Sequence, residues 1–136
     1  MTDEPSPTRP LVTEDYYFFF DGLAEEQLLA QRCGGCGNLR HPPQPMCPDC
    51  GSFTWTPEKL SGRGTVHSYA VHIHPPFPDY PSPHAIALVD MEEGVRVLGA
   101  LVGAEPSSIR IGEPVAVEFA KVGEIILHRF RRTTER

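Results

Sequence analysis

The chain has 136 residues, of which 40% are hydrophobic, and its formal net charge at pH 7 is −6. This length leaves room for one domain, or for one core with a small appendage, and no apolar run is long enough to span a membrane. Neutralised phosphates supply most of the affinity of proteins that bind nucleic acid without sequence preference. The acidic balance therefore argues against that class of protein.

The first expected element is a short helix that carries consecutive aromatic residues. Residues 1–13 contain three prolines and are expected to form a mobile arm, after which Thr13 or Asp15 can cap a helix over residues 14–27. Successive helical residues are rotated by about 100°, so five adjacent aromatics cover the whole circumference, whereas one small domain buries only one face. We expect this helix to dock on a protein partner or to wall an apolar ligand groove. The alternatives are a non-helical segment, or packing wholly on the chain's own ribbon. The candidate partner-facing residues here are Tyr16, Tyr17, Phe19 and Phe20.

All four cysteines of the chain lie in two CxxCG turns. A tetrahedral divalent metal takes four soft ligands at about 2.3 Å, a geometry that two facing turns supply. The glycine after each pair allows a positive φ, so that backbone amides can point at the thiolates. Disulfides are the competing interpretation, but the sequence shows no signal peptide and its spacing is typical of zinc sites. We predict structural rather than catalytic zinc, because thiolates fill every position; iron, as in rubredoxin, is the alternative metal. The predicted ligands are Cys33, Cys36, Cys47 and Cys50.

The rest of the chain is predicted to be mainly β. Short strands over residues 28–32 and 39–41 flank the first metal turn, and Trp55 is expected to pack between this ribbon and the segment after it. Beyond residue 59 the hydrophobic pattern becomes that of strands, with one helical turn at 106–109. Five strands with a helical turn between the third and fourth indicate an OB-fold barrel; an open five-stranded sheet is the alternative. The predicted strands cover residues 65–74, 84–91, 95–102, 115–119 and 125–131.

Two further expectations concern the second barrel strand and the loop before it. Ile86 and Leu88 are expected to face inwards, with Ala87 and Val89 as further candidates. The loop over residues 75–83 contains five prolines, which cannot pair in a sheet and which reduce the entropy lost when a loop makes contacts. We expect a binding loop that presents two aromatic side chains, with an ordinary surface loop as the alternative. These aromatic residues are Phe77 and Tyr80.

The histidines and the missing motifs argue against catalysis by this chain alone. His72 and His74 are expected to share one face of the first barrel strand, with His84 opposite one of them. A His-x-His pair can bind metal, but no nearby carboxylate or cysteine completes a ligand set. The sequence has no Ser-His-Asp order, no Gly-x-Ser-x-Gly elbow and no Gly-rich phosphate loop. We therefore expect no catalytic residue here.

Several consecutive motifs carry a family resemblance that spans about residues 14 to 132. The segments are DGLAEEQLLAQRC, CGGCGNLRHPPQPMCPDCGS, SGRGTVHSYAVHI, IALVDMEEGVRVLGALVG, IRIGEPVAVEF and HRFRR. Their order resembles the zinc-ribbon plus OB-fold family associated with acyl-CoA metabolism, once known only as a domain of unknown function. The family's usual Phe-Trp in the first helix is here Phe18-Phe19. The resemblance implies four segments: an arm (1–13), a docking helix (14–27), a zinc ribbon (28–58) and an OB-fold (59–136).

The same resemblance implies a function. Members of this family are companions of thiolase-like enzymes, and one such partner is an aldolase that acts on a steroid CoA thioester in steroid side-chain degradation. This chain is therefore expected to be a non-catalytic accessory subunit of a hetero-oligomer, with the acyl-CoA at or near the interface. Thiols held by metal, with no export segment in the sequence, indicate a reducing cytoplasm. A single-stranded nucleic-acid-binding module and a free-standing acyl-CoA-binding protein are the alternatives. The candidate cations for CoA phosphates, each of which is otherwise a solvated surface charge, are Arg40, Lys59 and Arg63.

Overall fold

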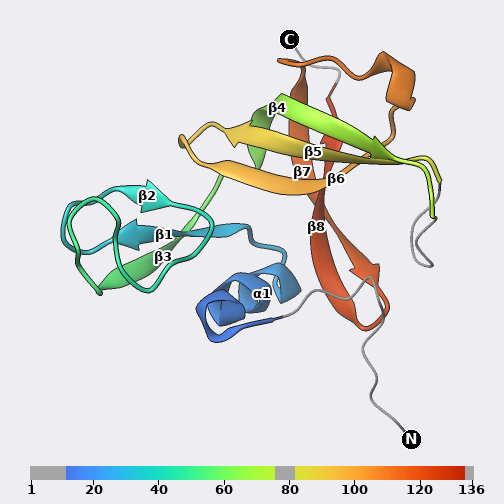
Figure 1. The fold of residues 1–136 in the computed structure, drawn as a ribbon. Coiled ribbons are helices and arrows are strands. Elements are labelled where there is room, and N and C mark those ends of the chain that lie inside the picture. Colours follow the sequence, from blue (N-terminus) through green and yellow to red (C-terminus); the bar gives the residue numbers. More distant parts are fainter. Residues whose placement is uncertain (1–11, 76–81, 134–136) are drawn as a thin grey trace, which may run out of the picture.

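The computed structural model describes residues 12–75 and 82–133. The expected arm lies almost wholly outside this part of the chain, as do Phe77 and Tyr80 of the proline-rich loop. Figure 1 shows a small ribbon beside a barrel, with the helix below them. No helix within the described residues is both long and apolar enough to cross a membrane.

The N-terminal helix is confirmed, but it is shorter than predicted. A 3-10 turn, η1 (Glu14–Tyr16), leads into α1 (Tyr17–Ala24). Thr13 takes the cap position without a side-chain hydrogen bond. Glu26 has a φ of 58°, in the left-handed region that a helix cannot continue through. The helix contacts β1 of the ribbon and β8 of the barrel, and these contacts bury Phe19 and Leu23.

The ribbon is a three-stranded antiparallel sheet with the order β2-β1-β3. Strands β1 (Leu29–Cys33) and β2 (Leu39–Arg40) lie where the sequence predicts them. The third strand, β3 (Trp55–Lys59), was not predicted. It contains Pro57, which lacks a backbone N–H and is tolerated only at a sheet edge, and β3 is indeed an edge strand that pairs with β1 alone.

The second half of the chain forms a closed five-stranded barrel. Its strand order is β4-β5-β6-β8-β7, and pairing of β4 with β7 closes it. Strands β6 and β8 pair in parallel, while the other pairs are antiparallel. The OB-fold prediction is confirmed, and the open-sheet alternative is wrong. The barrel elements are β4 (Arg63–His72), β5 (His84–Met91), β6 (Arg96–Val102), η2 (Pro106–Ser108), β7 (Pro114–Val122) and β8 (Ile125–Arg132).

The inward face of β5 corrects one prediction. Ala87 and Val89 are fully buried inside the barrel. Ile86 and Leu88, which were expected inside, are only half-buried and lie on the opposite face of the strand. Residues on one strand alternate between faces, so one choice of face determines the positions of all four side chains.

Helix, ribbon and barrel share one hydrophobic core. Phe19 and Leu23 from α1, Ala30 from β1, and Val66 and Phe130 from the barrel belong to a single cluster of buried residues. Each part therefore shields apolar surface of the other two from water.

Candidate metal centre and adjoining cavity

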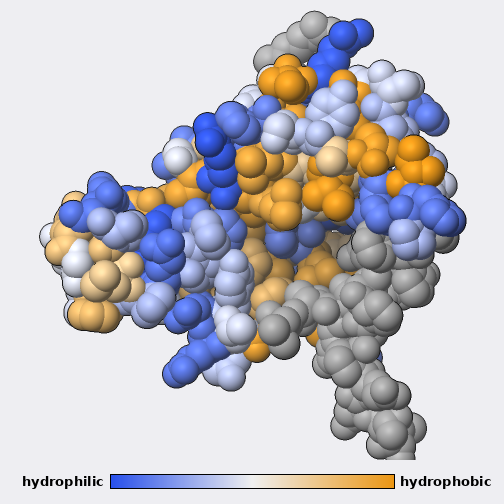
Figure 2. Space-filling view, viewed as in Figure 1, coloured by the Kyte–Doolittle hydropathy of each residue, from blue (hydrophilic) through white to orange (hydrophobic). Residues whose placement is uncertain are grey.

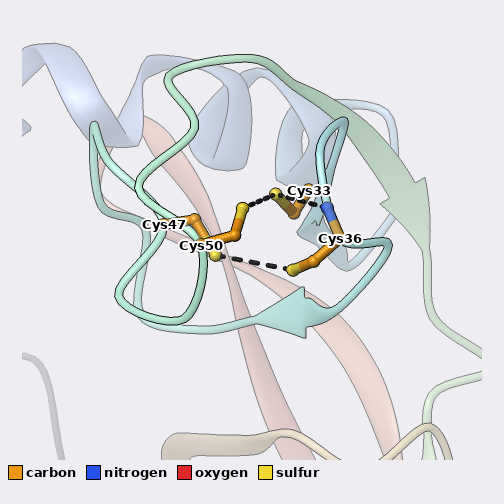
Figure 3. A group of neighbouring side chains, drawn as sticks. All are labelled: Cys33, Cys36, Cys47 and Cys50. Carbon is orange, nitrogen blue, oxygen red and sulfur yellow. Dashed lines mark hydrogen bonds between the residues drawn. The ribbon is translucent and has the colours of Figure 1, made fainter.

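The four cysteines come together as the spacing predicts. Their Sγ atoms all lie within 4.8 Å of one another, with Cys33 to Cys50 at 3.6 Å and Cys36 to Cys47 at 3.7 Å. Four sulfurs at about 2.3 Å from one zinc ion stand about 3.8 Å apart along each edge of the tetrahedron. Figure 3 shows the four side chains converging from the two turns. This donor set fits a tetrahedral metal ion.

The backbone of the two turns is built to present the sulfurs. Gly37 and Gly51 adopt φ angles of 80° and 79°, as the CxxCG pattern requires. Their N–H groups donate to the carbonyl oxygens of Cys33 and Cys47 at 3.1 and 2.9 Å. Both turns therefore have the same hydrogen-bonded geometry, and a side chain at either glycine would strain it.

Backbone amides also stabilise a thiolate at Cys33. The N–H groups of Cys36 and Gly35 donate to its Sγ at 3.5 and 3.3 Å. These two hydrogen bonds lower the pKa of the Cys33 thiol to about 6, because they stabilise the charged form. At Cys33 the backbone thus favours the ionised form that zinc requires. The four thiolates leave no open coordination position, so zinc here is structural.

The aromatic residues of the helix occupy unequal environments. Phe19 is 3% exposed and lies in the core, so the structure removes it from the predicted partner-facing set. Tyr16, Phe18 and Phe20 are partly buried against the same core. Only Tyr17, at 57% exposed, presents most of its ring to solvent. The partly buried rings are accommodated because α1 packs on both the ribbon and the barrel, and not on the ribbon alone.

Trp55 of the ribbon contributes to that packing. Its ring lies 4.6 Å from the ring of Phe18, centroid to centroid. The side chain therefore joins β3 of the ribbon to α1, which precedes the ribbon, whereas the sequence predicted packing against the segment that follows the ribbon.

The three predicted CoA-binding cations do not converge. Arg40 lies on β2 and lines a cavity of about 420 Å³ between the ribbon and the β5–β6 hairpin. Lys59 is the last residue of β3, paired with Leu29, and Arg63 at the start of β4 binds Glu92 at 2.9 Å. Neither of these two side chains lines the cavity.

The cavity instead brings Arg40 near residues that the sequence analysis did not single out. Arg96 and Asp90 of the barrel line the wall opposite the ribbon, and they bind each other at 2.7 Å. The available signal was their position on either side of the Glu92-Glu93-Gly94 turn, one residue away from it at each end. This position does not reveal that the β5–β6 hairpin reaches the ribbon, which is a feature of the tertiary structure.

The histidines show no second metal centre. His72 and His84 are directly opposite each other on β4 and β5, as predicted. Burial and the charge of His72 lower the pKa of His84. Within residues 12–75 and 82–133, the cysteine cluster is the sole group of three or more ligand-type side chains placed to hold a metal ion.

Comparison with known protein families gives two adjoining matches. Residues 20–56 match the model described as the ChsH2 rubredoxin-like zinc ribbon domain. Residues 57–120 match the model described as the ChsH2 C-terminal OB-fold domain. The metal assigned by the first model agrees with the sulfur geometry, so zinc is preferred to iron.

Individual relatives agree with this assignment. The 3-oxo-4,17-pregnadiene-20-carboxyl-CoA hydratase alpha subunit of Mycobacterium tuberculosis is 43% identical over 86% of this chain, but the match covers only 37% of that protein. A benzoylsuccinyl-CoA thiolase subunit, BbsA of Thauera aromatica, is 26% identical over 97% of this chain and 99% of its own length.

A solved structure also matches over nearly its whole length. A chain of the Ltp2-ChsH2(DUF35) aldolase superposes with a TM-score of 0.87 at 42% identity, and the match covers 91% of this chain and 98% of that one. Two chains that are 42% identical over nearly their whole lengths are related in sequence as well as in fold. The protein therefore belongs to the ChsH2 family, whose members join a rubredoxin-like zinc ribbon to an OB-fold domain.

Proposed function

We propose that this protein is a non-catalytic accessory subunit of a thiolase-like acyl-CoA enzyme, an aldolase of steroid side-chain degradation. The observation that carries the proposal is the likeness to the Ltp2-ChsH2(DUF35) aldolase, which extends over 98% of the matched chain. Two relatives named as subunits of CoA-thioester enzymes, a hydratase and a thiolase, support the same class of complex.

The chemistry of the described residues supports a subunit that positions rather than reacts. The metal is closed by four thiolates, so it offers no site for a substrate or a water. The partner then supplies the nucleophile and base, while this chain helps to orient the acyl-CoA and to exclude water from the site. The cytoplasmic location belongs to the same proposal, because the four cysteines form no disulfide and free thiols persist in a reducing compartment.

The molecular surface offers an apolar face for the partner. Figure 2 shows hydrophobic side chains gathered over the part of the barrel where Figure 1 draws β4, β5 and β6. Leu98 on β6 is 59% exposed, and its neighbour across the strands is the half-buried Leu88. We assign this face, together with Tyr17 on α1, to the thiolase-like partner. Apolar surface left open on an isolated chain is typical of an interaction site.

The same face argues against binding of single-stranded nucleic acid. Stacking of bases on aromatic side chains supplies much of the affinity of OB-folds for single strands. Strands β5 and β6 contain no Phe, Tyr or Trp, and the chain as a whole is acidic.

Native mass spectrometry of the tagged protein, isolated from its own cells, tests the proposal. We expect one zinc ion per copy of this chain and a stoichiometric thiolase-like polypeptide. Leu98→Asp should reduce the yield of that polypeptide about tenfold or more, because it places a charge in a desolvated interface. Ile111→Asp is the matched control, since Ile111 is 69% exposed but lies in the loop between η2 and β7. A zinc-loaded monomer, or equal loss of partner in both variants, would overturn the proposal.

A further inference from the structure

Arg40 is a buried cation whose hydrogen-bonding capacity is mostly unused. The residue is 9% exposed, and its Nη2 donates to the carbonyl oxygen of Gln44 at 3.1 Å. The Nε and Nη1 atoms are shielded from water, and neither has a hydrogen-bond partner among the residues that the structure describes. Those residues also provide no ion pair for its guanidinium.

This arrangement is energetically unfavourable unless an anion joins it. A guanidinium does not lose its proton in proteins, so Arg40 cannot avoid the cost of burial by becoming neutral. Buried donors without partners and buried charges without counter-ions each cost free energy. The position of Arg40 therefore calls for an anionic group from outside the described chain.

Among the described residues, one carboxylate, that of Asp90, lines the same cavity, and it already has a cationic partner in Arg96. Asp90 accepts from Nε of Arg96 at 2.7 Å through Oδ1, and its Oδ2 lies 3.1 Å from Nδ1 of His67. The charge of Asp90 is thus balanced by Arg96 within the barrel, which leaves the charge of Arg40 uncompensated. The described lining of the cavity has an excess of one positive charge.

The cavity is open to solvent and large enough to hold a small ligand. Its volume of about 420 Å³ falls within the range of about 300–1,000 Å³ typical of small-molecule pockets. The ribbon contributes Arg40, His41 and Gln44 to its lining, and the β5–β6 hairpin contributes Asp90 and Arg96. Two arginines from different parts of the fold thus line one cavity.

We propose that this cavity binds a phosphate group, with Arg40 as its main charge partner and Arg96 as the second. Because Nε and Nη1 of Arg40 are shielded in this structure, phosphate binding requires the guanidinium to turn until one of these atoms reaches a phosphate oxygen. The described lining of the cavity comes from this chain. That the phosphate comes from CoA rests on the accessory-subunit function proposed above; a free phosphate ion is the other source of the same chemistry.

The test uses the zinc-loaded chain alone and four probes: CoA, 3′-dephospho-CoA, pantetheine and inorganic phosphate. The dissociation constant and the rise in melting temperature are measured for each probe in phosphate-free buffer. We expect CoA to bind, and pantetheine, which has no phosphate, to give no shift. Binding of CoA together with inorganic phosphate identifies a site for phosphate ions in general, whereas binding of CoA alone identifies the nucleotide as the source. If 3′-dephospho-CoA binds more weakly than CoA, the 3′-phosphate is the group bound in the cavity. If the two bind equally, the pyrophosphate is the bound group.

Variants identify the residues responsible. Arg40→Met should weaken binding about tenfold or more, because one charge-assisted hydrogen bond is worth that factor or greater. It should also raise the melting temperature of the ligand-free protein, since it removes an uncompensated buried charge. Arg63→Met is the matched control, because Arg63 is an arginine on the same barrel that does not line the cavity. Arg96→Ala gives a second assay of the site if Arg40→Met does not fold.

Three results would overturn the phosphate site: no binding of CoA or phosphate by the wild type, equal binding by wild type and both cavity variants, or an equal shift with pantetheine. None of these bears on the accessory-subunit function, which is judged by recovery of the partner. Conversely, if no partner is recovered but the chain still binds phosphate through Arg40, the phosphate site stands and the accessory-subunit function does not.

Discussion

His41 illustrates how one buried side chain links the ribbon to the helix and barrel. Its ring lies 5.3 Å from that of Phe19, and its Nδ1 is buried without a hydrogen-bond partner in the described part of the chain. Burial, and then the neighbouring charge of His128, lower the pKa of His41 from 6.5 to about 4. The neutral ring is therefore the form that fits the folded protein.

This pKa predicts a loss of stability in mild acid. Between pH 6.5 and about 4 the unfolded chain binds a proton at His41 that the folded chain does not, so the free energy of unfolding falls as pH falls through this range. Below about pH 4, protonation of His41 lowers the free energy of unfolding by about 3 kcal/mol relative to its value at neutral pH. Urea unfolding of wild type and His41→Leu between pH 4.5 and 7 should show a shallower pH slope in the variant.

The matched control for this measurement is His74→Leu, at an exposed position after β4. Any release of zinc in acid affects all three proteins, so only the difference between their slopes reports on His41. Identical slopes in wild type and His41→Leu would exclude a contribution from this ring.

At the scale of the element, the ribbon depends on its metal. Its strands are short, β2 having only two residues, and two of its four cysteines are exposed. So small a sheet cannot bury enough apolar surface to hold two tight turns together. Zinc binding contributes about 10–16 kcal/mol to small structural sites, which exceeds what the ribbon could supply by packing.

Removal of one ligand should therefore unfold this element. We expect Cys47→Ser to lose stoichiometric zinc, protection of β1 amides against hydrogen exchange and binding of the thiolase-like partner. Zinc content and amide exchange measure the first two effects, and co-purification measures the third. Met46→Ser introduces serine at the adjacent exposed position. This variant should retain its zinc, the protection of the β1 amides and the binding of the partner. A Cys47→Ser protein that still forms an intact complex would show that the metal is dispensable.

At the scale of the whole molecule, the ribbon and barrel form one cooperative unit. Phe19 and Leu23 of the helix, Leu28 at the start of the ribbon, Leu60 between β3 and β4, and Phe130 of the barrel lie in the same buried cluster. Unfolding of the ribbon would expose apolar surface of the barrel, and exposure of this kind costs about 25 cal/mol per Å². The metal is thus expected to stabilise strands that do not touch it.

Chelation of zinc should lower the melting temperature of the barrel as well as that of the ribbon. Fluorescence of Trp55, the one tryptophan of the chain, reports on the ribbon, and protection of the Val117 amide, which donates to Gly62, reports on the barrel. We expect coincident transitions that move together on chelation and return when zinc is restored. A barrel transition that stays in place after chelation would mean that the two parts fold independently.

The sequence alone determined the metal site and where most strands lie along the chain, because both depend on local chemistry. Each CxxCG turn positions its own two sulfurs, and period-2 alternation with turn residues marks strands without reference to distant contacts. The one missed strand, β3, carries a proline that only its edge position accommodates.

Only the tertiary structure decided which faces are buried. Strand β5 is apolar on both sides, so its pattern could not show that Ala87 rather than Leu88 points inwards; closure of the barrel imposed that choice. Likewise, five aromatics in a row could not show that Phe19 would be enclosed between ribbon and barrel. The cavity that joins Arg40 to Arg96 depends on contact between segments more than fifty residues apart in sequence. Packing between distant segments determined these features, and residue patterns along one strand or helix carry no information about it.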